Sequence, residues 1–176
     1  MNSGQLGNGK NSKLLRSSRS KFRPLIGLAS IGKFQLLKDL FGEIVIPSAV
    51  YNEVVIQGKY QPGAKETREA DWIKVVEVQD HLAVNLLRNE LDQGESEALV
   101  LAKELGAVRI LIDERLARRK ARSVGLTVTG TLGVLLMAKE AGLIPAVRPL
   151  LDSLSETPFR MSENLYRRVL RMAGEA

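Results

Sequence analysis

The second half of the chain alternates between short apolar stretches and longer helical patterns, and this alternation constrains the fold more than any other feature. Residues 108–112 read VRILI, a near-continuous apolar run typical of a buried strand, and a helical pattern follows over residues 114–124. Residues 126–129 predict another strand, and residues 131–141 another helix, which Gly142 closes. Strands separated by helices of this length pair in parallel, so the sequence predicts an α/β fold with a mainly parallel sheet.

The first half extends the same pattern with shorter elements. The sequence predicts strands over residues 43–46 and 73–78, and Pro47 stops the first of them. Helices are predicted over residues 24–31, 33–41, 48–56, 64–71, 81–89, 94–105 and 162–173, with Ser48 and Ser162 as caps. The expected architecture is therefore a three-layer sandwich in which helices flank the sheet.

Charge divides the chain into a tail and a body. The net charge of the 176 residues is +6, and residues 1–23 hold six Lys and Arg side chains and no acidic one, so the remainder is formally neutral. We expect residues 1–23 to be a disordered basic tail and residues 24–176 to form one domain. The chain has no cysteine, which excludes a disulfide framework and a thiol nucleophile. No apolar run approaches the ~20 residues of a membrane span, so no membrane role and a cytoplasmic location are expected.

Acidic residues stand where a parallel fold places its ligands. Asp113 directly follows the VRILI strand, and ligands of such folds bind at the carboxyl ends of the strands. A carboxylate at a helix N-terminus has an alternative role, because it also interacts favourably with the helix dipole. Glu95 and Glu97 open a predicted helix, where they could be ordinary first-turn acids, and Glu53 could be a solvated helical residue.

Carboxylates gathered from several elements repel one another, and a hard cation relieves this repulsion. Mg²⁺ or Mn²⁺ takes oxygen ligands and favours substrates that carry phosphate. The basic run Arg115, Arg118, Arg119, Lys120 and Arg122 follows Asp113 and is either a solvated helix face or a surface that holds a phosphodiester backbone. His81 is expected at the surface and Trp72 in the core.

Three segments of the chain resemble the PIN-domain nucleases, in particular an uncharacterised, toxin-like branch from bacteria and archaea. They are PLIGLASIGKFQLLKDLFGEIVIPSAVYNEV, DQGESEALVLAKELGAVRILIDERLARRKARSVGLTVTGTLGVLLMAKEAGLI and, more loosely, FRMSENLYRRVL, which together cover most of residues 24–170. The resemblance implies a parallel sheet with acidic residues gathered at one end to bind Mg²⁺ or Mn²⁺. Members of the family commonly cleave single-stranded RNA, and many are toxins silenced by an antitoxin.

The resemblance also assigns residues to this site. By position, Glu53, Glu95 and Asp113 match three of the family's acidic residues and are the expected catalytic residues and metal ligands. Glu97 and Glu114 are the nearby acidic residues that would take the places of Glu95 and Asp113 in an alignment with the family that is shifted in register. The expected RNA-binding residues are Arg115, Arg118, Arg119 and Thr131, although the simplest role of Thr131 is a helix cap. An antitoxin protein and a second copy of the chain are candidate partners.

The chain departs from the family pattern at its beginning. The family has an apolar strand that ends in Asp three residues before the Pro-Leu-Ile sequence, and Lys21 occupies that position here. The preferred interpretation is that residues 1–23 replace the ancestral first strand. The competing one is that Asp39 or Glu43 supplies the missing charge.

Two functions follow from these expectations. The first is a metal-dependent endonuclease of single-stranded RNA, in which Glu53, Glu95 and Asp113 hold the metal. The second is a degenerate PIN-like protein that binds RNA or an antitoxin without cleavage. A third hypothesis, a domain that binds a small phosphorylated ligand, lacks support because no glycine-rich phosphate loop follows a strand.

Overall fold

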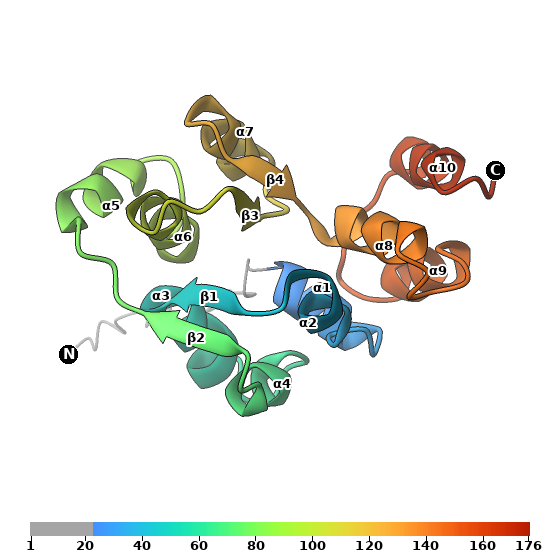
Figure 1. The fold of residues 1–176 in the computed structure, drawn as a ribbon, viewed down its shortest axis with the longest axis horizontal. Helices are drawn as coiled ribbons and strands as arrows, with labels where there is room; N and C mark the ends of the chain where they lie inside the picture. Colours follow the sequence, from blue (N-terminus) through green and yellow to red (C-terminus); the bar gives the residue numbers. More distant parts are fainter. Residues whose placement is uncertain (1–22) are drawn as a thin grey trace, which may run out of the picture.

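The structure, a computed structural model, describes residues 23–176. The expected tail and the Lys21 position therefore lie outside the described residues, apart from Arg23, which is the first residue of a helix. The elements are α1 (Arg23–Ser30), α2 (Leu36–Phe41), β1 (Ile44–Pro47), α3 (Ser48–Tyr51), the π-helix η1 (Asn52–Gln57), α4 (Ala64–Glu69), β2 (Ile73–Val76), α5 (His81–Leu87), α6 (Gln93–Glu104), β3 (Arg109–Leu111), α7 (Arg115–Ser123), β4 (Thr127–Thr129), α8 (Thr131–Glu140), α9 (Arg148–Ser155) and α10 (Glu163–Met172). Figure 1 shows their arrangement.

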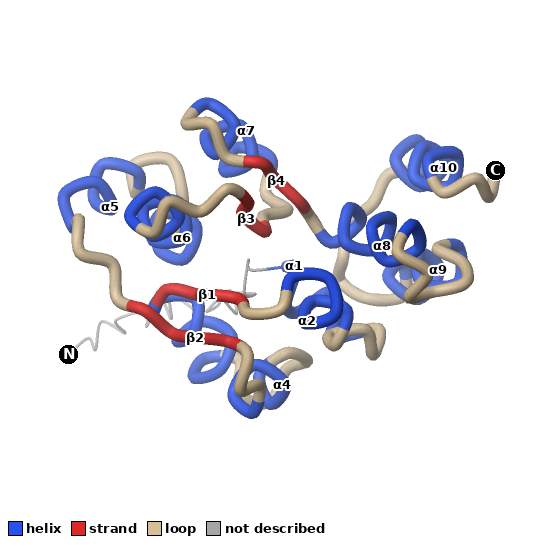
Figure 2. Tube along the Cα trace, in the orientation of Figure 1, coloured by secondary structure: helices blue, strands red, loops and turns tan. Residues whose placement is uncertain are grey.

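The strands form two parallel pairs. Strand β1 pairs with β2, with Ile44 opposite Ile73, and β3 pairs with β4, with Ile110 opposite Val128. Each pair is a separate two-stranded sheet among the described residues (Figure 2). The chain crosses between the strands of each pair through helices, as parallel pairing requires. The predicted α/β fold with parallel strands is confirmed.

Helix α6 connects the two strand pairs. It contacts β1 in one pair and β3 in the other, and it also packs against α3 and α5. The sequence favours a stable helix here because Asp92 and Glu95 form a capping box, in which each side chain accepts a hydrogen bond from the backbone N–H of the other residue. The first turn of α6, which is rich in acidic residues, thus has a fixed place beside α3.

One hydrophobic cluster holds most elements together. It contains Leu25 of α1, Ile46 of β1, Ile110 of β3 and Leu135 of α8. A smaller cluster of Val78, Val84, Val100 and Leu101 lies between α5, α6 and the segment after β2. Trp72 is partly buried against the main cluster and His81 is exposed, as expected. No helix within residues 23–176 has both the length and the apolar character needed to cross a bilayer.

Two local predictions were wrong, and one helix was missed. Ser48 is the first helical residue and not the cap, because Pro47 precedes the helix in an extended conformation. The helix predicted over residues 48–56 changes at Asn52 into a π-helix, which periodicity alone does not distinguish from an α-helix. Helix α9 was not predicted.

Candidate functional site

Asp113 is held by the first residue of a different helix. The backbone N–H of Thr131 donates to Oδ1 of Asp113 at 2.8 Å, and the Thr131 hydroxyl donates to Oδ2 at 2.6 Å. Asp113 follows β3 and Thr131 follows β4, so the parallel pairing of these strands brings the two residues together. Thr131 is fully buried and lies inside α8, whose N-cap is Gly130; its expected role as a cap was wrong.

Gly130 allows this close approach. A Cβ atom built on Gly130 would overlap Asp113 Oδ1 and would lie 2.7 Å from Nη1 of Arg118. The backbone of Gly130 is extended, so the requirement for glycine is steric and not conformational. The carboxylate and the guanidinium therefore both lie against the turn between β4 and α8.

Two arginines set the electrostatic environment of Asp113. Arg118 of α7 and Arg23 of α1 both act to lower the pKa of the Asp113 carboxyl, as do the two hydrogen bonds from Thr131. Burial opposes them and is the larger effect, so the pKa of Asp113 lies above its ordinary value. Asp113 is thus a desolvated acid whose charged form Arg118 and Arg23 favour, not a carboxylate that caps its own helix.

A second group of acidic residues lies at the start of α6. Oε2 of Glu53 would lie 3.0 Å from a Cβ atom on Gly94, and Oδ1 of Asp92 would lie 3.8 Å from the same point. Glu53 belongs to the π-helix η1, a helix type that is common at functional sites. Glu95 is buried, and its Oε2 accepts the backbone N–H of Asp92 at 3.2 Å. Glu53 and Glu95, two of the expected ligands, therefore both lie at the first turn of α6.

The two substitutes have different surroundings. Glu97 accepts the backbone N–H of Ala49 at 3.0 Å and the side-chain amide of Gln93 at 2.7 Å, so it ties α6 to α3. Glu114 occupies the N-cap position of α7, is exposed, and its side chain makes no capping hydrogen bond. Glu97 thus has a structural role, whereas Glu114 is open to solvent.

The described residues do not by themselves form a metal centre. Within residues 23–176, no group of three or more acidic or histidine side chains is arranged so that it could hold a metal ion. Both oxygens of Asp113 already accept hydrogen bonds from Thr131, and a cation, Arg118, lies beside them. The described residues therefore do not fit a three-carboxylate metal site, and the assignment of Glu53, Glu95 and Asp113 as ligands stays a prediction.

The basic residues of α7 divide into two kinds. Arg118 is partly buried beside Asp113, whereas Arg115 and Arg119 are exposed. Lys120 forms an ion pair with Glu90, so its charge is engaged within the protein. The exposed cations next to the Asp113 site are thus arginines, which bind phosphate oxygens well.

Sequence reasoning missed three residues of these sites. The capping residue Asp92 had a readable signal, the D-x-x-E pattern over residues 92–95. Gly130 stands in the GT sequence, but only the structure shows what its missing side chain would meet. Arg23 was counted in the tail, and no sequence pattern indicates its electrostatic effect on Asp113.

The model of the DUF3368 family, which is described as a PIN domain, matches residues 22–175. No curated protein and no solved structure matches the chain.

Proposed function

The chain belongs to the PIN-domain family, a nuclease-like superfamily, and from this membership we propose that it binds single-stranded RNA where β3 and β4 end. The observation that supports the proposal most is the grouping of Asp113, Thr131 and Arg118 around Gly130. This grouping lies at the carboxyl ends of parallel strands, where ligands of α/β folds bind.

Each part of the grouping suits a phosphodiester backbone in a different way. Arg115 and Arg119 lie one turn apart on α7, are exposed, and would contact phosphate oxygens by charge-assisted hydrogen bonds. Arg118 lies deeper, where its charge is partly balanced by Asp113. Because Thr131 donates two hydrogen bonds to Asp113, the position of this carboxylate is set before RNA binds.

Cleavage is the second candidate function. PIN domains generally use divalent metal ions, and carboxylate oxygens of Glu53 and Asp92 lie near each other around Gly94 at the start of α6. Against this, Asp113 is engaged by Thr131 and Arg118, and Lys21 stands where the family has an aspartate. We therefore expect this chain to bind RNA and to have little or no nuclease activity with Mg²⁺ or Mn²⁺.

The binding test uses a short fluorescein-labelled single-stranded RNA and fluorescence anisotropy. Replacing Arg115 and Arg119 together by Gln should weaken binding by roughly tenfold or more at low salt, because two phosphate contacts are lost. Arg168→Gln/Arg171→Gln is the matched control, since it removes the same two charges from exposed arginines on α10. Equal losses in both variants, or no loss in either, would overturn the proposal.

The cleavage test uses the same RNA with Mn²⁺. Three proteins are compared: the native chain, an Asp113→Ala variant, and a chimera with a family-like first strand that ends in Asp. Cleavage only by the chimera supports the binding function for the native chain. Robust native cleavage that disappears in Asp113→Ala would instead establish the endonuclease. An antitoxin partner and a homodimer stay predictions.

A further inference from the structure

The segment between α9 and α10 passes the beginning of α8, close to the residues that hold Asp113 (Figure 2). A Cβ atom built on Gly27 of α1 would lie 3.4 Å from Oγ1 of Thr131 and 3.8 Å from Cδ2 of Phe159. Thr131 and Phe159 are therefore both within contact distance of the same point on α1. Because Thr131 also donates two hydrogen bonds to Asp113, this arrangement places Phe159 beside the Asp113 site.

Helix α1 links Phe159 to the charges of this site. Arg23 and Gly27 are four residues apart in α1, so they lie on the same face of the helix. Arg23 is near enough to Asp113 for its charge to act on that carboxyl, whose pKa it acts to lower. One face of α1 therefore borders Asp113 at its first residue and Phe159 one turn later.

Hydrogen bonds hold the backbone just before Phe159. The hydroxyl of Thr157 donates to the carbonyl oxygen of Leu154 at 2.6 Å and accepts the backbone N–H of Phe159 at 3.2 Å. Phe159 packs against the main hydrophobic cluster but stays partly exposed, and Arg160, the next residue, is exposed. The structure therefore presents an aromatic residue and a cation next to each other on a backbone that is held in place.

Arg115 and Arg119 would contact phosphate oxygens, which are the same at every nucleotide and leave the bases unbound. The bases of single-stranded RNA are unpaired, and proteins commonly bind them by stacking them on aromatic rings. Granted the RNA binding proposed above, on which this contact rests, we propose that Phe159 stacks against one base of the bound strand and that Arg160 contacts a phosphate beside it. A duplex keeps its bases stacked on one another, so this contact favours single strands.

The test measures the affinity of the full chain for two fluorescein-labelled strands of equal length and charge. One is an oligouridine, and the other has the same ribose-phosphate backbone without bases. The native protein should bind the oligouridine at least about fivefold more tightly, because a base stacked on an aromatic side chain contributes this much or more. Any phosphate contacts of the basic residues before Arg23 are the same for both strands and cancel in the ratio of the two affinities.

Three variants separate stacking from packing. Phe159→Leu keeps an apolar side chain against Gly27 but removes the ring, so it should reduce the preference for oligouridine at least about fivefold and leave the affinity for the abasic strand within about twofold. Phe159→Tyr keeps a ring and should keep the preference. Phe41→Leu is the matched control, because Phe41 is also partly buried but lies over the guanidinium of Arg109, at the beginning of β3. The preference is a ratio measured on one sample, so an unfolded fraction of a variant does not change it.

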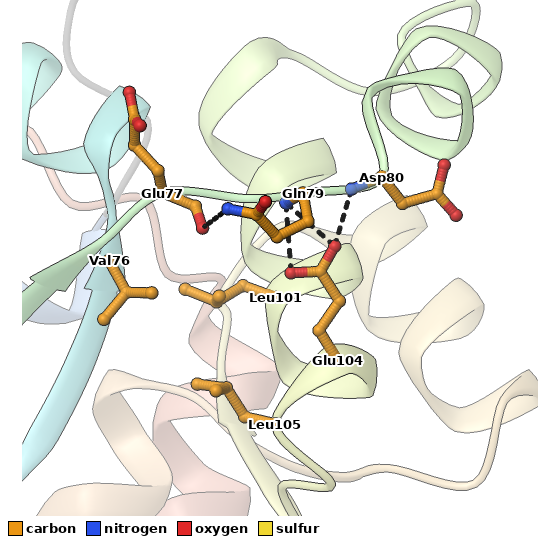
Figure 3. Close-up of a pocket in the computed structure, with 7 residues that line it drawn as sticks. All are labelled: Val76, Glu77, Gln79, Asp80, Leu101, Glu104 and Leu105. Carbon is orange, nitrogen blue, oxygen red and sulfur yellow. Dashed lines mark hydrogen bonds between the residues drawn. The ribbon is translucent and has the colours of Figure 1, made fainter.

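Amide chemical shifts locate the contact in the native protein. Addition of the oligouridine should shift the signals of Phe159 and Arg160. The signals of Gln79 and Asp80 should stay in place, because their N–H groups donate to the carboxylate of Glu104 in a groove that acidic residues border, and these repel phosphate (Figure 3).

The outcomes distinguish the stacking contact from the RNA binding on which it rests. Equal binding of both strands by the native protein would overturn the stacking contact and leave the proposed function standing. A Phe159→Leu variant that keeps the native preference would also overturn it, and one that loses the same affinity for both strands would assign Phe159 to packing alone. A native protein that binds neither strand would overturn the proposed function and the stacking contact together.

Discussion

At the scale of single residues, the hydroxyl of Thr131 has a testable energetic role. Its hydrogen bond to Asp113 is one of the interactions that lower the pKa of this partly buried acid. Thr131→Val keeps the volume but removes the donor. We expect the free energy of unfolding to fall by about 1–3 kcal/mol, because the carboxylate loses a charge-assisted hydrogen bond. Chemical denaturation at pH 7 measures this change.

The Thr131→Val substitution should also change the pKa of Asp113. Loss of the hydrogen bond removes an interaction that lowers the pKa of Asp113, so this pKa should rise further in the Thr131→Val variant, as NMR of the carboxyl carbon can follow. Thr131→Ser is the control, because serine keeps the hydroxyl and should leave the pKa near its native position. A Thr131→Val variant that keeps the native free energy of unfolding and the native pKa of Asp113 would contradict this role of the hydroxyl.

At the scale of elements, Glu175 fastens the end of the chain to α8 and α9. Its carboxylate accepts hydrogen bonds from Nζ of Lys139 at 2.7 Å and from the backbone N–H groups of Val147 at 2.6 Å and Arg148 at 2.9 Å. The Lys139 hydrogen bond is the main reason that the pKa of Glu175 falls to about 2. A carboxyl whose pKa is lower in the folded protein stabilises the fold above its ordinary pKa.

The hydrogen bonds of Glu175 predict a difference in melting temperature between native protein and variant that depends on pH. Glu175→Gln should lower the melting temperature at pH 7, where the native carboxylate is charged in both states. The stabilising contribution of Glu175 is lost as the pH falls from 4.5 toward about 2, so native and variant melting temperatures should converge there. Thermal unfolding between pH 7 and pH 2.5 measures this convergence. Glu156→Gln, at an exposed acid near the end of α9, should show no such trend.

The elements show what the sequence could and could not predict. Strands and helices with a clear stop were predictable, as for α7, whose pattern ends before Gly125, and for α10, whose cap Ser162 accepts the backbone N–H of Leu165. Helix α9 was missed although Leu150, Leu151 and Leu154 have helical spacing and Pro149 stands in the first turn, where proline is tolerated.

The site was predictable only in part, because some of its residues are brought together by contacts between distant segments of the chain. The end of a strand marks Asp113, so periodicity and the position rule for parallel sheets lead to it, whereas Thr131 was expected only from the family resemblance. The π-helix around Glu53 and the neighbours of Gly130 depend on packing between segments distant in sequence. Such contacts leave no periodic signal, and for this reason Arg23 and the arrangement around Gly94 required the structure.

At the scale of the whole molecule, the charge distribution separates two sources of RNA binding. The excess of positive charge belongs to residues 1–23, while residues 24–176 are formally neutral. The tail should therefore bind RNA without sequence preference through counterion release, whereas Arg115 and Arg119 of α7 should act as part of a fixed site. These two contributions differ in how strongly salt affects them.

A salt series on two full-length variants separates the contributions. Replacing the basic residues at positions 10, 13, 16, 19 and 21 by Gln should reduce the slope of log affinity against log salt by up to about 3.5, since each contact with a single strand contributes about 0.7. The Arg115→Gln/Arg119→Gln variant should reduce it by about 1.4 on the same basis. Native and tail-neutralised proteins with indistinguishable slopes would show that the tail makes no phosphate contact, and RNA binding would then rest on the body of the protein. Because the tail variant leaves Arg23 and its interaction with Asp113 in place, any loss it causes reports on the tail and not on the site.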